Sequence, residues 1–221
     1  LDKQVGRLLD KLKEIGELEN TLILFTSDNG PHFAADGHDL EFFDSNGALR
    51  GGKRDLYEGG IRVPLLAFWE GKISKNSRSE HIAAFQDIMP TFSELIQIEK
   101  PKQAEGISFL PTLLGKKQEA HEYLNWEFQL SGWFQELPTG GFRQSVRINN
   151  WKAVRYGVDN KVELYNLQDD PSESKDLAMQ YPEIVLSAEQ IFRESRTDVE
   201  GFPYGGVVQN HKSLDKIELK E

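Results

Sequence analysis

The chain has 221 residues, of which 26 are Lys or Arg and 36 are Asp or Glu, so its formal net charge is −10. It contains no cysteine, which excludes disulfide bonds, thiolate catalysis and sulfur-based zinc sites within these residues. The acidic balance argues against binding to nucleic acid or to an anionic membrane, because both require a basic surface. The longest apolar stretches fall far short of the roughly 20 residues that a membrane span needs.

The first part of the chain predicts a helix followed by a buried strand. Apolar residues recur at helical spacing between Leu1 and Ile15, and Gly16 stands where a C-terminal cap would lie. The run 21–27 is largely apolar and is typical of a strand covered on both faces. It ends at the turn residues Asp28, Asn29, Gly30 and Pro31.

The segment from His32 to Gly60 predicts a long loop, because it is rich in glycine and charge and has little periodicity. Loops of this length are uncommon inside compact domains and are often functional. A second buried strand is predicted over 61–69, with Pro64 placing its paired part afterwards. Helical spacing over 82–98 predicts a helix that begins or kinks at Pro90. This order of elements is an α/β pattern.

Short aromatic or alternating segments follow residue 120 and predict a meander of antiparallel strands. Pairs of turn-forming residues at 149–150 and 159–160 lie between them. A helix is predicted from Pro182 to about Arg196, and residues 201–221 are expected to form a tail wrapped on another surface. The predicted strands cover 123–128, 145–148, 151–156 and 162–165.

Asp28 and Asn29 are the first candidate site, at the carboxyl end of a predicted buried strand. Open α/β sheets bind ligands at such strand ends. A carboxylate next to an amide carbonyl offers the hard oxygen donors that Ca²⁺ and Mg²⁺ take, although the same residues are also ordinary turn formers. Two ligands fall short of the roughly six to eight that Ca²⁺ takes, so the others would have to come from elsewhere.

The cationic cluster from Arg50 to Arg54 is the second candidate site. Its glycines would let backbone approach an anion, and Lys53 supplies a compact charge for a sulfate or phosphate oxygen. The alternative is a solvated basic loop on an acidic protein. The Glu58-Gly59-Gly60 turn that follows is expected to be structural, with Glu58 and Arg62 paired.

The histidines and several aromatic residues leave their roles open. His32 and His38 follow the candidate metal pair and could bind a metal, transfer a proton or lie on the surface. His81, His121 and His211 are predicted to be surface residues. Four aromatic residues could line a sugar or aryl pocket, although core packing is the main expectation for them: Trp126, Phe128, Trp133 and Phe134.

Five segments of the chain, taken together and in this order, resemble the sulfatase family. The block from Lys53 to Gly-Gly-x-Arg-x-Pro and the Glu-Leu-Tyr-Asn-Leu-x-x-Asp-Pro block are weak signals singly and specific as a pair. The resemblance covers nearly the whole chain. The segments are LILFTSDNG (22–30), GGKRDLYEGGIRVP (51–64), DIMPTFSELIQI (87–98), GISFLPTLLG (106–115) and ELYNLQDDPSESKDLA (163–178).

The resemblance implies an alkaline-phosphatase-like α/β domain followed by a smaller α+β domain with a four-stranded antiparallel sheet and a helix. We therefore expect residues 1–120 to be the C-terminal part of the first domain and 121–221 to form the second. It also implies that Asp28 and Asn29 bind Ca²⁺ and that Lys53 contacts the sulfate as a catalytic group. The substrate would be a sulfated small molecule or glycan.

The nucleophile of the family is a formylglycine, made from Cys or Ser in a Cys/Ser-x-Pro/Ala-x-Arg motif, and no segment here matches it. The nearest stretch, 74–78, has Asn76 where Pro or Ala is required, and it follows Lys53, whereas the family motif lies near the N-terminus. We therefore expect the C-terminal half of a sulfatase that is inactive alone. The alternatives are a non-catalytic module that binds an anion or a sugar, and a phosphoryl-transfer relative of the same superfamily.

What the chain lacks leads to two further expectations. Without their neighbours in the sheet, the strands predicted over 21–27 and 61–69 would expose edges and apolar faces, which favours self-association of the truncated chain. The absence of any Asn-x-Ser/Thr site and of cysteine favours a bacterial protein. The resemblance favours a periplasmic or extracellular location.

Overall fold

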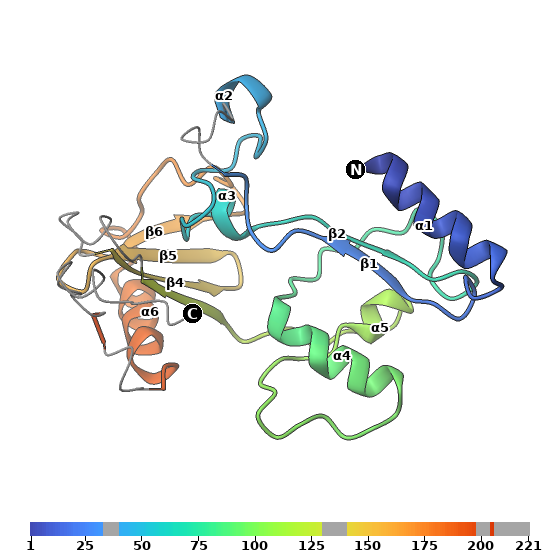
Figure 1. The fold of residues 1–221 in the computed structure, drawn as a ribbon. Coiled ribbons are helices and arrows are strands. Elements are labelled where there is room, and N and C mark those ends of the chain that lie inside the picture. Colours follow the sequence, from blue (N-terminus) through green and yellow to red (C-terminus); the bar gives the residue numbers. More distant parts are fainter. Residues whose placement is uncertain (33–39, 130–140, 198–203, 206–221) are drawn as a thin grey trace, which may run out of the picture. The chain divides into compact units, whose positions relative to one another are not determined.

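The computed structural model describes residues 1–32, 40–129, 141–197 and 204–205 (Figure 1). They belong to two compact units, the first formed by Leu1–Ser27 with Pro64–His121 and the second by Asp28–Val63 with Glu122–Glu221. The division after His121 falls near residue 120, whereas the segment 28–63 groups with the C-terminal residues. The boundary at 120 between two domains of a longer protein stays a prediction.

The first unit opens with helix α1 (Asp2–Glu14), as the apolar spacing predicted. Gly16 takes a positive φ of 75°, which glycine adopts without steric cost. Its N–H donates to the carbonyl of Lys13 at 3.2 Å, and the N–H of Glu17 donates to the carbonyl of Leu12 at 2.9 Å. The predicted glycine cap is therefore confirmed, and it satisfies carbonyls that have no partner within the helix.

Strands β1 (Ile23–Thr26) and β2 (Leu65–Phe68) form an antiparallel pair in this unit, in register from Ile23 with Phe68 to Thr26 with Leu65. Both strands were predicted, and β2 begins directly after Pro64. The expectation that both faces are covered is wrong for the described residues, since Leu66 of β2 is 60% exposed. The physical reason is that, among the described helices and strands, β1 and β2 make extensive contacts only with each other, so no second layer covers their faces.

The helix predicted over 82–98 is shorter and consists of η2 (Phe85–Asp87) and α4 (Ile88–Leu95). Pro90 lies in the first turn of α4, where its missing N–H leaves no helical hydrogen bond unmade. Asp87 fixes this start, because its buried carboxylate accepts hydrogen bonds from the N–H groups of Ala84 (2.7 Å) and Ile107 (2.9 Å). The short helix α5 (Leu110–Leu113) completes the unit.

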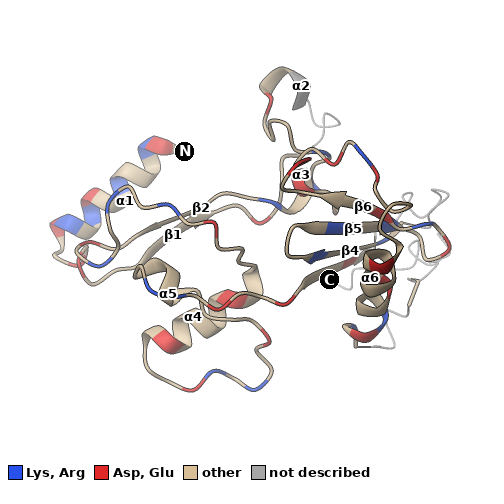
Figure 2. Cartoon of the chain, turned by 180° about the vertical axis from the view of Figure 1, so that it is seen from behind, with Lys and Arg blue, Asp and Glu red and all other residues tan. Residues whose placement is uncertain are grey.

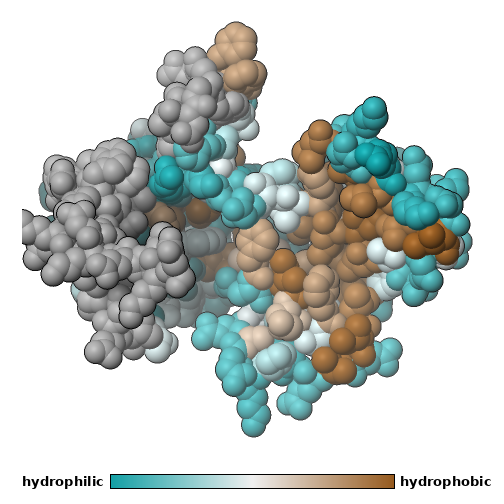
Figure 3. Space-filling model, viewed as in Figure 1, coloured by the Kyte–Doolittle hydropathy of each residue, from teal (hydrophilic) through white to brown (hydrophobic). Residues whose placement is uncertain are grey.

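The first unit leaves much of its apolar surface exposed. In Figure 3 the apolar residues gather over β1, β2 and the neighbouring helices, whereas both clusters of buried apolar side chains in the described residues belong to the second unit. Such exposed apolar surface favours association; self-association of the chain stays a prediction. The exposed side chains include Leu66, Phe85, Met89, Ile96 and Ile98.

The second unit is built on the predicted meander, a sheet of four antiparallel strands in the order β3-β4-β5-β6. The long predicted loop contains two short helices, α2 (Leu40–Phe43) and α3 (Glu58–Ile61). The C-terminal helix α6 (Pro182–Glu194) was predicted with almost the same bounds. The strands are β3 (Leu124–Gln129), β4 (Phe142–Ile148), β5 (Trp151–Tyr156) and β6 (Glu163–Asn166).

The two faces of this sheet are covered by different parts of the chain. Ala153 of β5 packs in one cluster with Ala188 and Phe192 of α6. Its neighbour Val154 points to the other face, because side chains alternate along a strand, and packs there with Tyr57. The sheet therefore lies between α6 and the segment that carries α3.

Several predictions fall partly or wholly outside the described residues. The predicted tail 201–221 is one; within it Tyr204 and Gly205 are described, and the Tyr204 hydroxyl accepts a hydrogen bond from Arg155 at 2.7 Å. The others are His38, Trp133, Phe134 and His211. Among the helices that the structure describes, none is long and apolar enough to cross a membrane.

Candidate active site

Two turns of the second unit, one with Asp28 and Asn29 and one with Lys53, are joined by backbone hydrogen bonds. The N–H of Gly30 donates to the carbonyl of Gly60, and the N–H of Lys53 donates to the carbonyl of Pro31, both at 2.8 Å. These bonds fix the candidate metal turn against the candidate anion-binding turn. The structure therefore brings together the segments that carry all three predicted site residues.

Glycines make this close approach possible. A Cβ atom on Gly30 would lie 1.8 Å from the carbonyl oxygen of Gly59. A Cβ atom on Gly60 would lie 2.1 Å from the carbonyl oxygen of Asp55 and 2.5 Å from that of Gly52. Real Cβ contacts are never this short, so these positions exclude any side chain. Gly30 and Gly60 thus allow one backbone segment to approach another. The approach of an anion to the glycines beside Lys53 stays a prediction.

Asp28 and Asn29 offer two oxygen donors for a cation. Asp28 is exposed and its carboxylate makes no hydrogen bond or ion pair with the described residues. These donors have the hard character that Ca²⁺ prefers. The described residues contain no group of three or more His, Asp or Glu that could hold a metal. The chemistry of the pair fits Ca²⁺, but two donors are fewer than the roughly six to eight that this ion takes, so a complete site would need further ligands.

Lys53 and Arg50, from the same cationic cluster, differ in their surroundings. Arg50 donates hydrogen bonds to the Tyr165 hydroxyl (2.8 Å) and to the Glu173 carbonyl (3.1 Å). Its guanidinium also lies 3.8 Å from the ring centre of Tyr57. Arg50 is therefore a structural cation. The half-buried Lys53 has no hydrogen-bond or ion-pair partner for its ammonium among the described residues, so this charge can meet a ligand.

Two tyrosines beside Arg50 share one carboxylate. The hydroxyls of Tyr57 and Tyr165 both donate to Oε2 of Glu163 at 2.6 Å. Burial, and then the hydrogen bonds to Glu163, raise the pKa of both hydroxyls well above the usual value. These tyrosines stay protonated at neutral pH and act as hydrogen-bond donors within the fold.

A buried charge cluster behind the two turns was not predicted from the sequence. Lys152 of β5 is fully buried, and its ammonium donates to Oε1 of Glu58 at 2.9 Å. Glu173 accepts a hydrogen bond from the Glu58 N–H at 2.7 Å, and its other oxygen lies 3.9 Å from the Lys152 ammonium. The predicted Glu58–Arg62 pair is confirmed at 3.8 Å, but Lys152 is the closer partner of Glu58.

One sequence signal could have identified Lys152 as buried. Lys152 stands two residues before Val154 in β5, so the two side chains point to the same face of the sheet. Figure 2 shows Lys and Arg on both central strands, β4 and β5. Because Glu58 opens α3, whose Gly60 carbonyl receives the Gly30 N–H, the cluster ties the metal-side turn to the C-terminal sheet.

The stability of this unit should depend on pH through Glu173. Burial raises the pKa of Glu173 from an ordinary value of 4.5 to about 7, although Lys152 opposes the shift. The folded state then binds more protons than the unfolded chain between these values, so its stability falls as pH rises from about 4.5 to about 7. Glu173→Gln should remove this component, on the order of 3 kcal/mol. Urea unfolding of both proteins at several pH values in this range measures the difference. If the free energy of unfolding changed with pH by the same amount in both proteins, the prediction would be wrong.

Two histidines of the first unit were predicted to be surface residues, but the structure places them in more buried positions. His121 is only 11% exposed, and its Nε2 atom lies 2.9 Å from the buried carboxylate of Asp87. His81 is half-buried, burial lowers its pKa, and its Nε2 atom has no hydrogen-bond partner among the described residues. The contact of His121 spans 34 residues, so local periodicity gave no sign of it. His32 is half-buried, and its role stays open.

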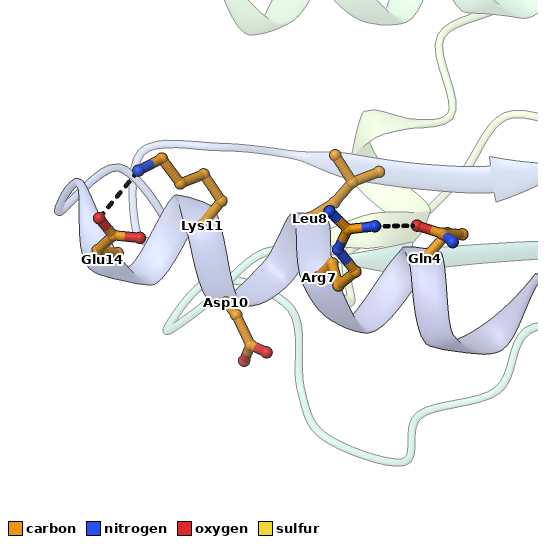
Figure 4. A pocket seen from close by; sticks show the side chains of 6 residues that line it. All are labelled: Gln4, Arg7, Leu8, Asp10, Lys11 and Glu14. Atoms are coloured by element: carbon orange, nitrogen blue, oxygen red, sulfur yellow. Dashed lines mark hydrogen bonds and ion pairs between the residues drawn. The ribbon is translucent and has the colours of Figure 1, made fainter.

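A shallow hollow on α1, in the first unit, contains none of the candidate site residues (Figure 4). All the side chains that line it come from this one helix. Two of its interactions are between neighbours along the helix, Arg7 with Gln4 and Lys11 with Glu14, both at 2.9 Å. Such pairs stabilise a helix modestly and leave no convergent group for chemistry. The hollow is lined by Gln4, Arg7, Leu8, Asp10, Lys11 and Glu14.

Comparison with protein families decides the class of this chain. A family model described as "N-sulphoglucosamine sulphohydrolase, C-terminal" matches residues 51–197, and one described as "Sulfatase" matches residues 1–98. The chain belongs to the sulfatase family. The resemblance found in the sequence motifs is thereby confirmed.

Known sulfatases align with most of this chain. An uncharacterized sulfatase of Escherichia coli, YdeN, is 32% identical over 88% of the chain and 38% of its own length. An N-acetylgalactosamine-6-O-sulfatase of Bacteroides thetaiotaomicron is 29% identical over 89% of the chain and 40% of its own length. A solved structure, in complex with its substrate D-glucosamine-2-N,6-O-disulfate, is 25% identical with a TM-score of 0.68, over 88% of this chain and 37% of that one.

This sulfatase chain spans about two-fifths of the length of these relatives. The matched part agrees with the prediction of a C-terminal portion. The predicted fold class, part of an alkaline-phosphatase-like α/β domain followed by a small domain with an antiparallel sheet and a helix, is confirmed by the structural match.

Proposed function

We propose that this chain is the C-terminal portion of a sulfuric ester hydrolase, in which Asp28 and Asn29 bind Ca²⁺ and Lys53 contacts the sulfate group. The observation that carries the proposal is the pair of backbone hydrogen bonds between the two turns that hold these residues. The exposed carboxylate of Asp28 and the unpartnered ammonium of Lys53, among the described residues, support it.

The chemistry assigned to these residues is electrostatic. When sulfate is released from an ester, negative charge moves onto the leaving alcohol and the sulfate oxygens. The ammonium of Lys53 would bind and orient a sulfate oxygen and stabilise that charge. A Ca²⁺ ion, when bound, supplies a second positive charge at the same group. The formylglycine nucleophile of the family has no counterpart in these residues and is expected in another part of the longer protein.

We propose sulfated carbohydrates as the first substrate class to test, with aryl sulfates as the second. Two of the relatives described above are named for sulfated amino sugars or hold one as substrate. A bacterial protein of the periplasm or the extracellular space is the proposed setting.

The second candidate function is a non-catalytic module that binds an anion or a sugar. The observation that favours it is the absence of cysteine and of the nucleophile motif from the sequence. Such a module would bind a sulfated sugar without hydrolysing it, also when it is part of a longer protein. A phosphoryl-transfer relative would instead hydrolyse an aryl phosphate faster than the matching sulfate.

The test compares the 221-residue chain with the longer natural protein, using a sulfated amino sugar, an aryl sulfate and an aryl phosphate. We expect no turnover by the chain alone and sulfate release by the longer protein. Lys53→Ala should lower kcat/KM by about 10²- to 10³-fold, the effect of removing one charge-stabilising donor. Asp28→Ala should weaken Ca²⁺ binding in calorimetry.

The matched control for Lys53→Ala is Lys161→Ala, which removes an exposed lysine from the same unit and should leave kcat/KM unchanged. Turnover by the chain alone, well above that of its own Lys53→Ala variant, would refute the assignment of a partial enzyme. A longer protein that binds a sulfated sugar but releases no sulfate would favour the non-catalytic module.

A further inference from the structure

The residues around Lys53 form a β-turn with one residue in an unusual conformation. The turn spans Gly52 to Asp55 and is closed by the Asp55 N–H, which donates to the Gly52 carbonyl at 2.8 Å. Arg54, its third residue, takes a φ of 79°, whereas Lys53 does not take a positive φ. This is the φ pattern of a type II turn, which usually has glycine as its third residue.

Arg54 therefore stores strain next to Lys53. A non-glycine residue in the left-handed region costs of order 1 kcal/mol or more, and such a conformation persists only when its surroundings hold it. The arrangement places Lys53 at the second position of the turn. If the strain were released, the backbone that aims the Lys53 side chain would change.

Arg143, at the start of β4, supplies contacts that hold this conformation. Its Nη1 group donates to the carbonyl of Arg54 at 2.6 Å and to Oδ1 of Asp55 at 2.7 Å. Its side chain is only 10% exposed, and its guanidinium lies 4.2 Å from the ring centre of Tyr156. One buried cation thus binds the two residues that follow Lys53.

Asp55 and Tyr156 complete the same set of contacts. The Tyr156 hydroxyl donates to Oδ1 of Asp55 at 3.0 Å and accepts from the Leu56 N–H at 3.2 Å. The other oxygen of Asp55 accepts from the Gly52 N–H at 3.1 Å, inside the turn. Both carboxylate oxygens of Asp55 therefore help to fix the turn, with Arg143 and Tyr156 contributed by the C-terminal sheet.

We propose that Arg143 is a positioning residue, which holds the Gly52–Asp55 turn in its strained conformation and thereby aims Lys53 at the sulfate group. The proposal rests on the proposed role of Lys53. The Lys53 N–H also donates to the Pro31 carbonyl next to the metal-side turn. Lys53 is therefore held by this bond on one side and by the contacts of Arg143 on the other. An error of about 1 Å in the placement of a catalytic group costs up to about 100-fold in rate.

The test uses Arg143→Met, Arg54→Gly and the double variant in the longer protein. Arg143→Met should lower kcat/KM for a sulfate ester by about 10- to 100-fold, by loss of positioning. Arg54→Gly relieves the strain, because glycine takes a positive φ without steric cost, and its kcat/KM is the baseline for the double variant. The double variant should recover most of the loss, since a glycine turn no longer needs Arg143 to hold it.

The matched control is Arg196→Met. Arg196 forms a similarly buried ion pair with Glu127 of β3, at 3.0 Å and with its own side chain 9% exposed. It should lower the free energy of unfolding without changing kcat/KM. Arg143→Met with full activity, or a folded Arg143→Met whose loss Arg54→Gly does not relieve, would overturn the proposal.

A second measurement separates this proposal from the proposed function. In the 221-residue chain, the nuclear Overhauser effect between the amide and α hydrogens of Arg54 reports its φ angle, because these two hydrogens lie closest together when φ is positive. Arg143→Met should weaken this effect, whereas Arg196→Met should leave it unchanged. Retention of the full effect in Arg143→Met would overturn the positioning role even if the longer protein released no sulfate.

Discussion

Replacing Lys152 by Met should unfold the second unit under conditions in which the unchanged protein is folded. The ammonium of Lys152 is fully buried, 2.9 Å from Glu58 and 3.9 Å from Glu173. Its loss would leave two buried carboxylates without their shared cation. Breaking a buried ion pair from one side costs about 3–5 kcal/mol, a large fraction of the stability of an ordinary domain. Urea unfolding followed by circular dichroism measures the loss.

Two further variants make this result specific. Lys161→Met removes an exposed lysine from the same unit and should change the free energy of unfolding by less than about 0.5 kcal/mol. Adding Glu173→Gln to Lys152→Met should recover part of the loss, because the buried Glu173 carboxylate has no other ion-pair partner among the described residues. A loss below about 1 kcal/mol for Lys152→Met would show that the cluster contributes little to the fold.

The expected loss has a functional side as well. Glu58 opens α3, and the Gly60 carbonyl of the same helix binds the N–H of Gly30 beside Asn29. The buried cluster is thus one link between the C-terminal sheet and the turn proposed to bind Ca²⁺. A partial weakening of the cluster should therefore lower Ca²⁺ affinity before the unit unfolds.

Local sequence patterns predicted the elements of this chain because each of those patterns is short-range. The alternation in 151–156 and the turn residues at 149–150 specify neighbouring strands, and the meander follows from hairpins in sequence. The α6 helix is likewise defined by its own apolar spacing and Pro182. The continuous apolar runs of β1 and β2 fit burial on both faces, but their covering is absent from the described residues.

The candidate site was predictable only in part. The residues assigned to ligands, Asp28, Asn29 and Lys53, follow from motifs, and their roles stay predictions. The interactions that hold these residues in place join distant parts of the chain. Lys152 is 94 residues from its partner Glu58, and Arg143 is 88 residues from its partner Asp55. No periodic pattern reports such a pairing, because it depends on how the meander packs against the loop.

Replacing Gly30 by Ala should separate the two turns of the candidate site. A Cβ atom at this position would lie 1.8 Å from the Gly59 carbonyl oxygen and 3.0 Å from the Gly60 Cα. Both neighbours are backbone, so neither can turn aside as a side chain would. The hydrogen bond from Gly30 to the Gly60 carbonyl would have to break, and Asp28 and Asn29 would move with it.

We expect Gly30→Ala to lower Ca²⁺ affinity about tenfold or more, and kcat/KM of the longer protein by about 100-fold, as for other misplaced catalytic groups. The control is Gly6→Ala in α1, where a Cβ atom meets nothing within 4 Å and should stabilise the helix by up to about 1 kcal/mol. Calorimetry with Ca²⁺ and thermal melting of both variants separate a local effect from unfolding. Unchanged Ca²⁺ binding and activity in Gly30→Ala would mean that the contact between the two turns does not serve the site, since such a clash cannot be absorbed without moving one turn from the other.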